Sequence, residues 1–112
     1  MKINDVYGVE EPDLEKLLSY MISIFGNNFQ MRNSHYKGGT YYTLHKTHFA
    51  ESITLQANFN KYENDYEEKE YEHYKTLIYI NSTNHGDEIQ KKLKEIQPNI
   101  FLINRFYVNN NE

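Results

Sequence analysis

The chain contains no cysteine, no tryptophan and only two prolines. Without cysteine it forms no disulfide, builds no thiolate metal site and has no cysteine nucleophile. Long apolar runs are also missing, so we expect neither a membrane-spanning segment nor a membrane partner. Residues 1–12 include three acidic side chains and no apolar stretch. We therefore predict no signal peptide and a cytoplasmic location.

Clustered positive charge is scarce as well. Twelve Lys and Arg stand against sixteen Asp and Glu, and the formal net charge is −4. A surface that binds nucleic-acid phosphates needs clustered Lys or Arg, and we find no such cluster, so direct nucleic-acid binding is not expected. A length of 112 residues is typical of one domain, and we predict a single globular domain over residues 1–112.

Aromatic residues make up for a modest apolar content. Hydrophobic residues form 38% of the chain, and aromatic residues form 15% through eleven Tyr and six Phe. Tyrosine must therefore supply part of the core, with hydroxyl groups at its margin or at an interface. The core positions that we expect from the apolar stripes are Leu18, Phe25, Ile53, Leu55, Ile78, Leu93 and Leu102.

The first half of the chain predicts one helix and three strands. From Pro12 to Phe25 the apolar residues recur at helical intervals, and Gly26 provides the stop. Alternation with a period of two then predicts a hairpin that turns at Gly38 and Gly39. A third strand is expected over Phe49–Phe59, with one apolar and one solvated face.

The second half predicts a strand, a helix and a strand. Residues Glu70–Ile80 alternate as a fourth strand, and a second helix follows, capped from the run Ser82–Asn84 and ended by Pro98. The last strand, Ile100–Val108, is almost continuously apolar, so we expect it in the centre of the sheet after a crossover helix. The predicted fold class is α+β, with one antiparallel-dominated five-stranded sheet, both helices on one face and the order α-β-β-β-β-α-β. The opposite face of the sheet is expected to be available for binding.

Five histidines raise the question of a metal or acid–base site. His45, His48 and Glu51 are spaced by three residues, which would align them on a helix, but the segment reads as strand or turn. His35 and His73, with Glu72, could supply an acid and a base, yet no spacing brings them together. We find no phosphate loop, nucleophile elbow or paired-carboxylate motif. The expectation is a protein without a catalytic residue, cofactor or metal.

The segment from Tyr62 to Tyr74 is the most distinctive part of the chain, because carboxylates alternate there with tyrosines. Fixed negative charge beside rigid aromatic surface suits a basic protein partner, through steering and anchoring. A solvated hairpin whose charges prevent strand aggregation is the alternative. The predicted partner-binding residues are Tyr62, Glu63, Asp65, Tyr66, Glu67, Glu68, Glu70, Tyr71, Glu72 and Tyr74.

In size, element order and this acidic, aromatic stretch, the chain resembles the immunity proteins of bacterial contact-dependent inhibition and other polymorphic toxin systems. The resemblance implies a cytoplasmic protein that binds a cognate toxin domain, often a nuclease, and blocks its active site or its access to substrate. Two other classes stay open: an adaptor or structural subunit that pairs through a sheet edge, and a small histidine-dependent enzyme.

Overall fold

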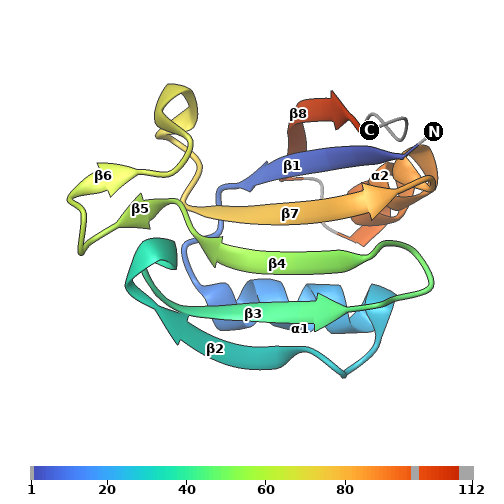
Figure 1. The fold of residues 1–112 in the computed structure, drawn as a ribbon, viewed down its shortest axis with the longest axis horizontal. Helices are drawn as coiled ribbons and strands as arrows, with labels where there is room; N and C mark the ends of the chain where they lie inside the picture. Colours follow the sequence, from blue (N-terminus) through green and yellow to red (C-terminus); the bar gives the residue numbers. More distant parts are fainter. Residues whose placement is uncertain (1, 97–98, 109–112) are drawn as a thin grey trace.

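The computed structural model describes residues 2–96 and 99–108 of the chain. Within them, a six-stranded sheet has the strand order β2-β3-β4-β7-β1-β8, and β5 and β6 form a separate two-stranded sheet (Figure 1). The elements follow the chain as β1 (Ile3–Val9), α1 (Leu14–Phe25), β2 (Gln30–Ser34), η1 (His35–Lys37), β3 (Gly39–His45), β4 (Ser52–Ala57), β5 (Phe59–Asn60), β6 (Asp65–Tyr66), η2 (Lys69–Tyr71), β7 (Thr76–Thr83), α2 (Gly86–Ile96) and β8 (Ile100–Tyr107).

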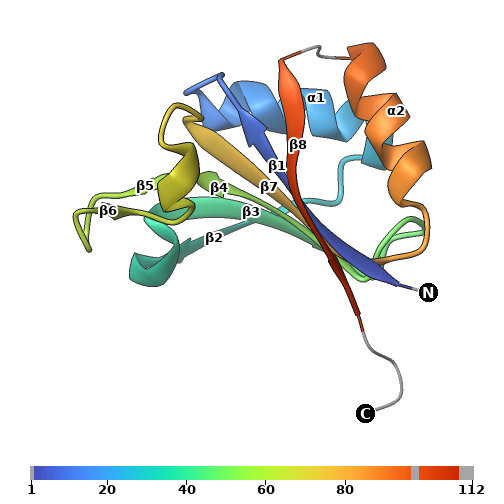
Figure 2. The same ribbon diagram turned by 90° about the horizontal axis from the view of Figure 1, so that it is seen from above.

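Both helices lie on the same face of the large sheet, as predicted (Figure 2). β7 and β8 are each antiparallel to β1, which lies between them, so β7 and β8 run parallel to one another. α2 provides the crossover connection that parallel strands require. The α+β class, the antiparallel pairing and the crossover are therefore confirmed.

The sheet has six strands, so the prediction of five was wrong. The missing strand is β1, where Asn4 and charged Asp5 interrupt the apolar residues, so that the sequence shows no apolar stretch. In the structure Asp5 is buried, and Arg105 on β8 donates to its two carboxylate oxygens at 2.8 and 2.9 Å. A partner that is a hundred residues away offsets the cost of burying this charge, and local sequence does not reveal it.

The last strand is also placed differently from the prediction. β8 is the outermost strand on its side of the sheet, and β1 occupies the position that we expected for it. The nearly continuous apolar sequence of β8 predicted that both faces of the strand are buried. The burial is only partial, because Phe101, Phe106 and Tyr107 are exposed. An apolar run thus did not distinguish a central strand from an apolar edge.

The boundaries of four elements differ from the prediction. α1 begins at Leu14, because Asp13 is its N-cap and accepts hydrogen bonds from the backbone of Glu15 and Lys16. β4 is shorter than the predicted third strand, and residues 69–71 form the turn η2 where we expected the fourth strand to begin. α2 starts at Gly86, and Pro98, the predicted stop, lies outside the described residues.

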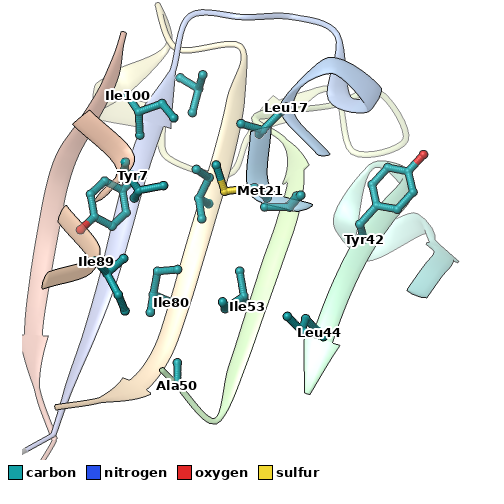
Figure 3. Packing of buried hydrophobic residues seen from close by; sticks show 14 residues of the cluster. Tyr7, Leu17, Met21, Tyr42, Leu44, Ala50, Ile53, Ile80, Ile89 and Ile100 are labelled. Atoms are coloured by element: carbon teal, nitrogen blue, oxygen red, sulfur yellow. The ribbon is translucent and has the colours of Figure 1, made fainter. Parts of the chain in front are cut away.

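The main core lies between the helices and the sheet (Figure 3). Leu17 and Met21 of α1 and Ile89 and Leu93 of α2 meet the side chains of the central strands there. Tyrosine contributes to this core, as expected, through Tyr7 and Tyr42. Among the predicted core residues, four are buried and three are partly buried at the margin: Ile53, Leu55, Ile78 and Leu93, then Leu18, Phe25 and Leu102.

The face of the sheet opposite the helices is not free, contrary to our expectation. Leu77 and Val6 point to that face, because their strand neighbours point into the main core, and they are 0% and 5% exposed. Gln56, which we expected on a solvated face, is also buried. The chain between β4 and β7 folds back over this side and contributes a second, smaller layer of packing.

Candidate partner-binding site

Residues 59–74, which we call the acidic lobe, connect β4 to β7 and contain β5, β6 and η2 (Figure 1). The lobe has six carboxylates and two lysines, a formal charge of −4, which equals the net charge of the whole chain. Negative charge is therefore concentrated in one part of the molecule. Residues outside the lobe balance, with ten acidic and ten basic side chains.

Buried Asn58, immediately before the lobe, fixes its two ends to each other. Its Nδ2 donates to the carbonyl oxygens of Tyr71 and Tyr74, both at 2.9 Å. Its Oδ1 accepts from the backbone N–H of Glu68 at 3.0 Å, and its own carbonyl accepts from Glu67. Residues 68–74 form no β-strand, and the side chain of Asn58, which is 0% exposed, provides hydrogen bonds that a neighbouring strand would otherwise supply.

A second buried asparagine, Asn60, shapes the tip of the lobe. Its Oδ1 accepts hydrogen bonds from the backbone N–H groups of Tyr62 and Glu63, at 3.0 and 3.2 Å. Its Nδ2 donates to the carbonyl oxygens of His35 and Tyr36 in η1, at 2.8 and 3.1 Å. The lobe is therefore tied to the turn between β2 and β3, and the backbone of its tip is held in one conformation.

The inner side of the lobe packs on the sheet through tyrosines. The ring of Tyr74 lies flat over Gly8, where a Cβ would come within 2.5 Å of the ring carbons, so only glycine fits beneath it. Tyr74 also contacts Phe101, with ring centroids 5.9 Å apart. The hydroxyl of Tyr71 donates to the carbonyl of Ile103 on β8 at 3.4 Å. These rings serve the fold and form its second apolar layer.

Glu68 of the lobe accepts a hydrogen bond from the hydroxyl of Tyr79 on β7 at 2.9 Å. Burial raises the pKa of Tyr79 well above its ordinary value, and the hydrogen bond to Glu68 adds to the increase. Burial also raises the pKa of Tyr7, whose hydroxyl is the one buried side-chain oxygen or nitrogen of the described residues without a hydrogen-bond partner. Both phenols are therefore held in the neutral form.

We predict that Tyr79 ionises only when the protein unfolds. Its pKa is higher in the folded than in the unfolded chain, so its contribution to stability is full below pH 10.0, the ordinary value, and is lost as the pH rises above it. The measurement is the phenolate absorbance of the wild type and of Tyr79→Phe during alkaline titration. The two curves should coincide while the protein is folded and separate when it unfolds. A smaller rise for Tyr79→Phe in the folded protein would contradict the prediction.

The outer side of the lobe presents charge and aromatic surface to solvent. Glu63, Glu70 and Glu72 are exposed. Tyr62 is 48% exposed, and its ring stacks on His35 with 4.1 Å between centroids. This stack holds Tyr62 in place, and the ammonium of Lys61 lies over the ring, 5.3 Å from its centroid. The ring is still partly exposed, so it can serve as an aromatic anchor.

Two further contacts stiffen the hairpin of the lobe. Asp65 and Lys69 form an ion pair at 3.0 Å, and the hydrogen bond from Lys69 lowers the pKa of Asp65. Tyr66 packs edge-on against Phe59, with ring centroids 5.1 Å apart. Phe59 is 41% exposed and extends the aromatic surface beyond the residues that sequence reasoning selected.

All ten predicted partner-binding residues lie in the lobe, but the structure divides them into two groups. Tyr62, Glu63, Asp65, Glu70 and Glu72 make up the outer group, whereas Glu68, Tyr71 and Tyr74 face the sheet. Tyr66 and Glu67 lie at the boundary, half-buried. His35, which we had weighed only as an acid or base, was not among the predicted partner-binding residues, and neither were Phe59 and the two asparagines. The only local signal for the latter was the run Asn58-Phe59-Asn60, which places amides at the mouth of a loop.

The histidines do not assemble into a site. His35 stacks on Tyr62, and His73 packs on Tyr74 with 4.0 Å between centroids. His45 contacts Thr43, and His48 lies beside His85. No three His, Asp or Glu side chains of the described residues converge as metal ligands would. The positions of these rings are explained by packing with neighbouring side chains.

Comparison of the chain with protein-family models, curated proteins and solved structures gave no match. Neither helix within the described ranges is long and apolar enough to cross a membrane. The geometry and charge of the acidic lobe are therefore the features that bear on function.

Proposed function

We propose that the protein binds and neutralises a cognate, basic toxin domain in the cytoplasm, as an immunity protein, with the outer side of the acidic lobe as its docking surface. In this proposal it acts by covering the substrate-binding surface of the toxin. It requires no cofactor and no catalytic residue of its own. A nuclease domain is the most suitable partner, because a cleft that binds phosphates presents the clustered positive charge that the lobe would complement.

The observation that carries the proposal is a strongly charged loop that is held rigid. Charge repulsion among six carboxylates favours an extended, mobile segment. The chain instead uses two buried asparagines and two inward tyrosines to hold this loop on the sheet. A loop that is ordered before binding loses less conformational entropy on association, so this arrangement favours affinity for a partner.

A solvated hairpin that only prevents strand aggregation needs charged side chains but does not need an ordered backbone. The order of the lobe therefore supports a role in binding over this alternative. β5 and β6 are two residues each and already too short to recruit another strand. Fixing Tyr62 against His35 does nothing further to protect such an edge. It does prepare an aromatic ring, flanked by carboxylates, for contact with a partner.

The expected partner is a basic toxin domain encoded by a gene next to that of this chain, and the test measures the binding kinetics of the two proteins by stopped flow. We expect Glu63→Lys, Glu70→Lys and Glu72→Lys together to slow association by about tenfold or more at low salt and to remove most of its salt dependence. Tyr62→Ala should mainly increase the dissociation rate. Loss of protection from the co-expressed toxin should follow the loss of affinity.

The matched control reverses three exposed carboxylates outside the lobe, Glu10, Glu51 and Glu95, which changes the net charge equally. This variant should associate much more like the wild type. Equal slowing by both sets would attribute the effect to overall charge and not to the lobe. A lobe variant that binds and protects like the wild type would exclude the lobe as the docking surface.

A further inference from the structure

β8, the outermost strand on its side of the sheet, carries several exposed apolar side chains. Of the eight large apolar or aromatic side chains that are exposed in the described residues, three lie on β8: Phe101, Phe106 and Tyr107. No described strand pairs with this edge, since β8 ends the strand order. Its backbone N–H and C=O groups on that side are available for pairing with another strand.

This edge lacks the charge that usually protects a free edge. β8 has one charged residue, Arg105, and its guanidinium is engaged by Asp5 and Asp87. The opposite edge strand, β2, is polar throughout apart from Met31, and its Arg32 is exposed. The two edges of one sheet thus differ, and β8 is the edge with less protection by charge.

The hydrogen bonds of the described strands show which groups of β8 point outward. Val108 donates to the carbonyl of Lys2, so its backbone groups face β1, and those of Tyr107 and Arg105 face away. At the other end, the carbonyl of Val9 faces β7, where it accepts from Lys75. Gly8 and its partner Phe101 therefore face each other, and the groups of Ile100 and Leu102 point outward.

A bulge gives this outward set an internal symmetry. Val6 and Tyr7 are opposite Asn104 and Leu102, so Ile103 is an extra residue in β8. The outward residues are consequently Ile100, Leu102, Arg105 and Tyr107. Their spacing is the same when read in either direction along the strand.

We propose that β8 pairs antiparallel with β8 of a second copy, joining two sheets across a two-fold axis. In the register that matches the spacing, Ile100 is opposite Tyr107 of the second copy and Leu102 is opposite its Arg105. The same register places Phe101 directly opposite Phe106 of the second copy, twice in the dimer. Both rings project from the face that carries the lobe, because their β1 partners Gly8 and Asn4 lie on that face.

The occupant is a second copy because the edge is complementary to itself. A two-fold contact brings identical surfaces together, so an unpaired charge on the edge would lie near the same charge of the second copy and repel it. The charged residue of β8, Arg105, is already paired with Asp5 and Asp87. The extra residue in β8 would distort pairing with a regular strand, whereas it lies opposite the same irregularity in a second copy. The exposed phenylalanines then form a cross-strand aromatic pair, which favours association.

Sedimentation of the full chain over a range of concentrations tests the dimer. We expect the wild type to dimerise and two variants to weaken dimerisation about tenfold or more. Phe106→Lys replaces one ring of the aromatic pair by a charged side chain. Tyr107→Pro removes a backbone N–H that points outward and leaves the hydrogen bonds to β1 intact. Met31→Lys alters an exposed apolar residue on β2 and should remain dimeric. Circular dichroism verifies that each variant is folded.

The absence of cysteine allows a direct test of register. Antiparallel positions that share no hydrogen bond accept a disulfide across two strands, so chains with Phe101→Cys should cross-link to chains with Phe106→Cys when the two are mixed and oxidised. Each variant alone should cross-link far less. The proposal would be overturned if the wild type were monomeric, or if Met31→Lys were the variant that lost the dimer. It would also be overturned if each cysteine variant alone cross-linked as much as the mixture.

Discussion

Replacing Arg105 by Met should lower the free energy of unfolding by about 3–5 kcal/mol, the largest effect that we expect from a single polar side chain here. Arg105 donates to both carboxylate oxygens of Asp5, which is 1% exposed, and these hydrogen bonds also raise the pKa of Arg105. Methionine keeps much of the apolar stem of the side chain but leaves the buried carboxylate without a counter-charge. Urea denaturation measures the difference.

Two variants show whether the loss comes from the unpaired charge. Arg32→Met removes an exposed arginine on β2 and should change stability by well under about 1 kcal/mol. Adding Asp5→Asn to Arg105→Met removes the stranded charge and should recover part of the loss. If Arg105→Met were as stable as Arg32→Met, Asp5 would not depend on this ion pair, and our account of why β1 accepts an acidic residue would be wrong.

Replacing Asn58 by Ala should lower the free energy of unfolding by about 3 kcal/mol or more. The substitution leaves the carbonyls of Tyr71 and Tyr74 and the N–H of Glu68 without their present partner, and each buried unsatisfied group costs about 1–3 kcal/mol. The loss should be accompanied by opening of the lobe. Hydrogen exchange at the amide of Glu68 should therefore accelerate more than exchange in β7.

Asn33→Ala provides the control, because Asn33 is exposed on β2. It should leave both stability and lobe exchange nearly unchanged. Were Asn58→Ala to lose stability while the lobe amides stayed protected, Asn58 would stabilise the fold without ordering the lobe. The preorganisation that supports the binding proposal would then need another source.

Elements with strong local signals were predictable from the sequence. The apolar stripe from Leu14 to Phe25 has an acidic cap at Asp13 and a glycine stop, so its helix is specified by neighbouring residues. Gly38 adopts a φ of 82° at the turn of the β2–β3 hairpin, which is where the glycine pair indicated a turn. The amphipathic α2 and its crossover followed from periodicity in the same way.

The features that were missed depend on residues far apart in the chain. Strand β1 was not predicted, and the partner that allows its acidic Asp5 to be buried, Arg105, lies at the other end of the described chain. The alternation from Glu70 to Ile80 suggested one long strand, but Asn58 captures the carbonyls of Tyr71 and Tyr74 and turns the first part away. Such tertiary hydrogen bonds override local β-propensity, and a single sequence gives no sign of them.

For the lobe, only the types of residue could be predicted from the sequence, and not which of them face the sheet and which face solvent. Carboxylates and tyrosines indicated a binding surface, yet the same residue types also build the inner packing of the lobe. Tyr74 serves the fold because Gly8 leaves room for its ring, and Glu68 does so because Tyr79 reaches it. The outer group, with Tyr62 at its centre, could be separated from the inner group only in three dimensions.

The place of β1 between β7 and β8 also bears on how the chain is made. Both neighbours of β1 come much later in the sequence, from Thr76 onward, so during synthesis β1 waits without a partner until β7 and β8 have been made. Hairpin β2–β3 and helix α1 can form early, but closing the sheet requires the longest loop in the molecule. High contact order of this kind slows folding, and we expect the six-stranded sheet to form only after β8 has been synthesised.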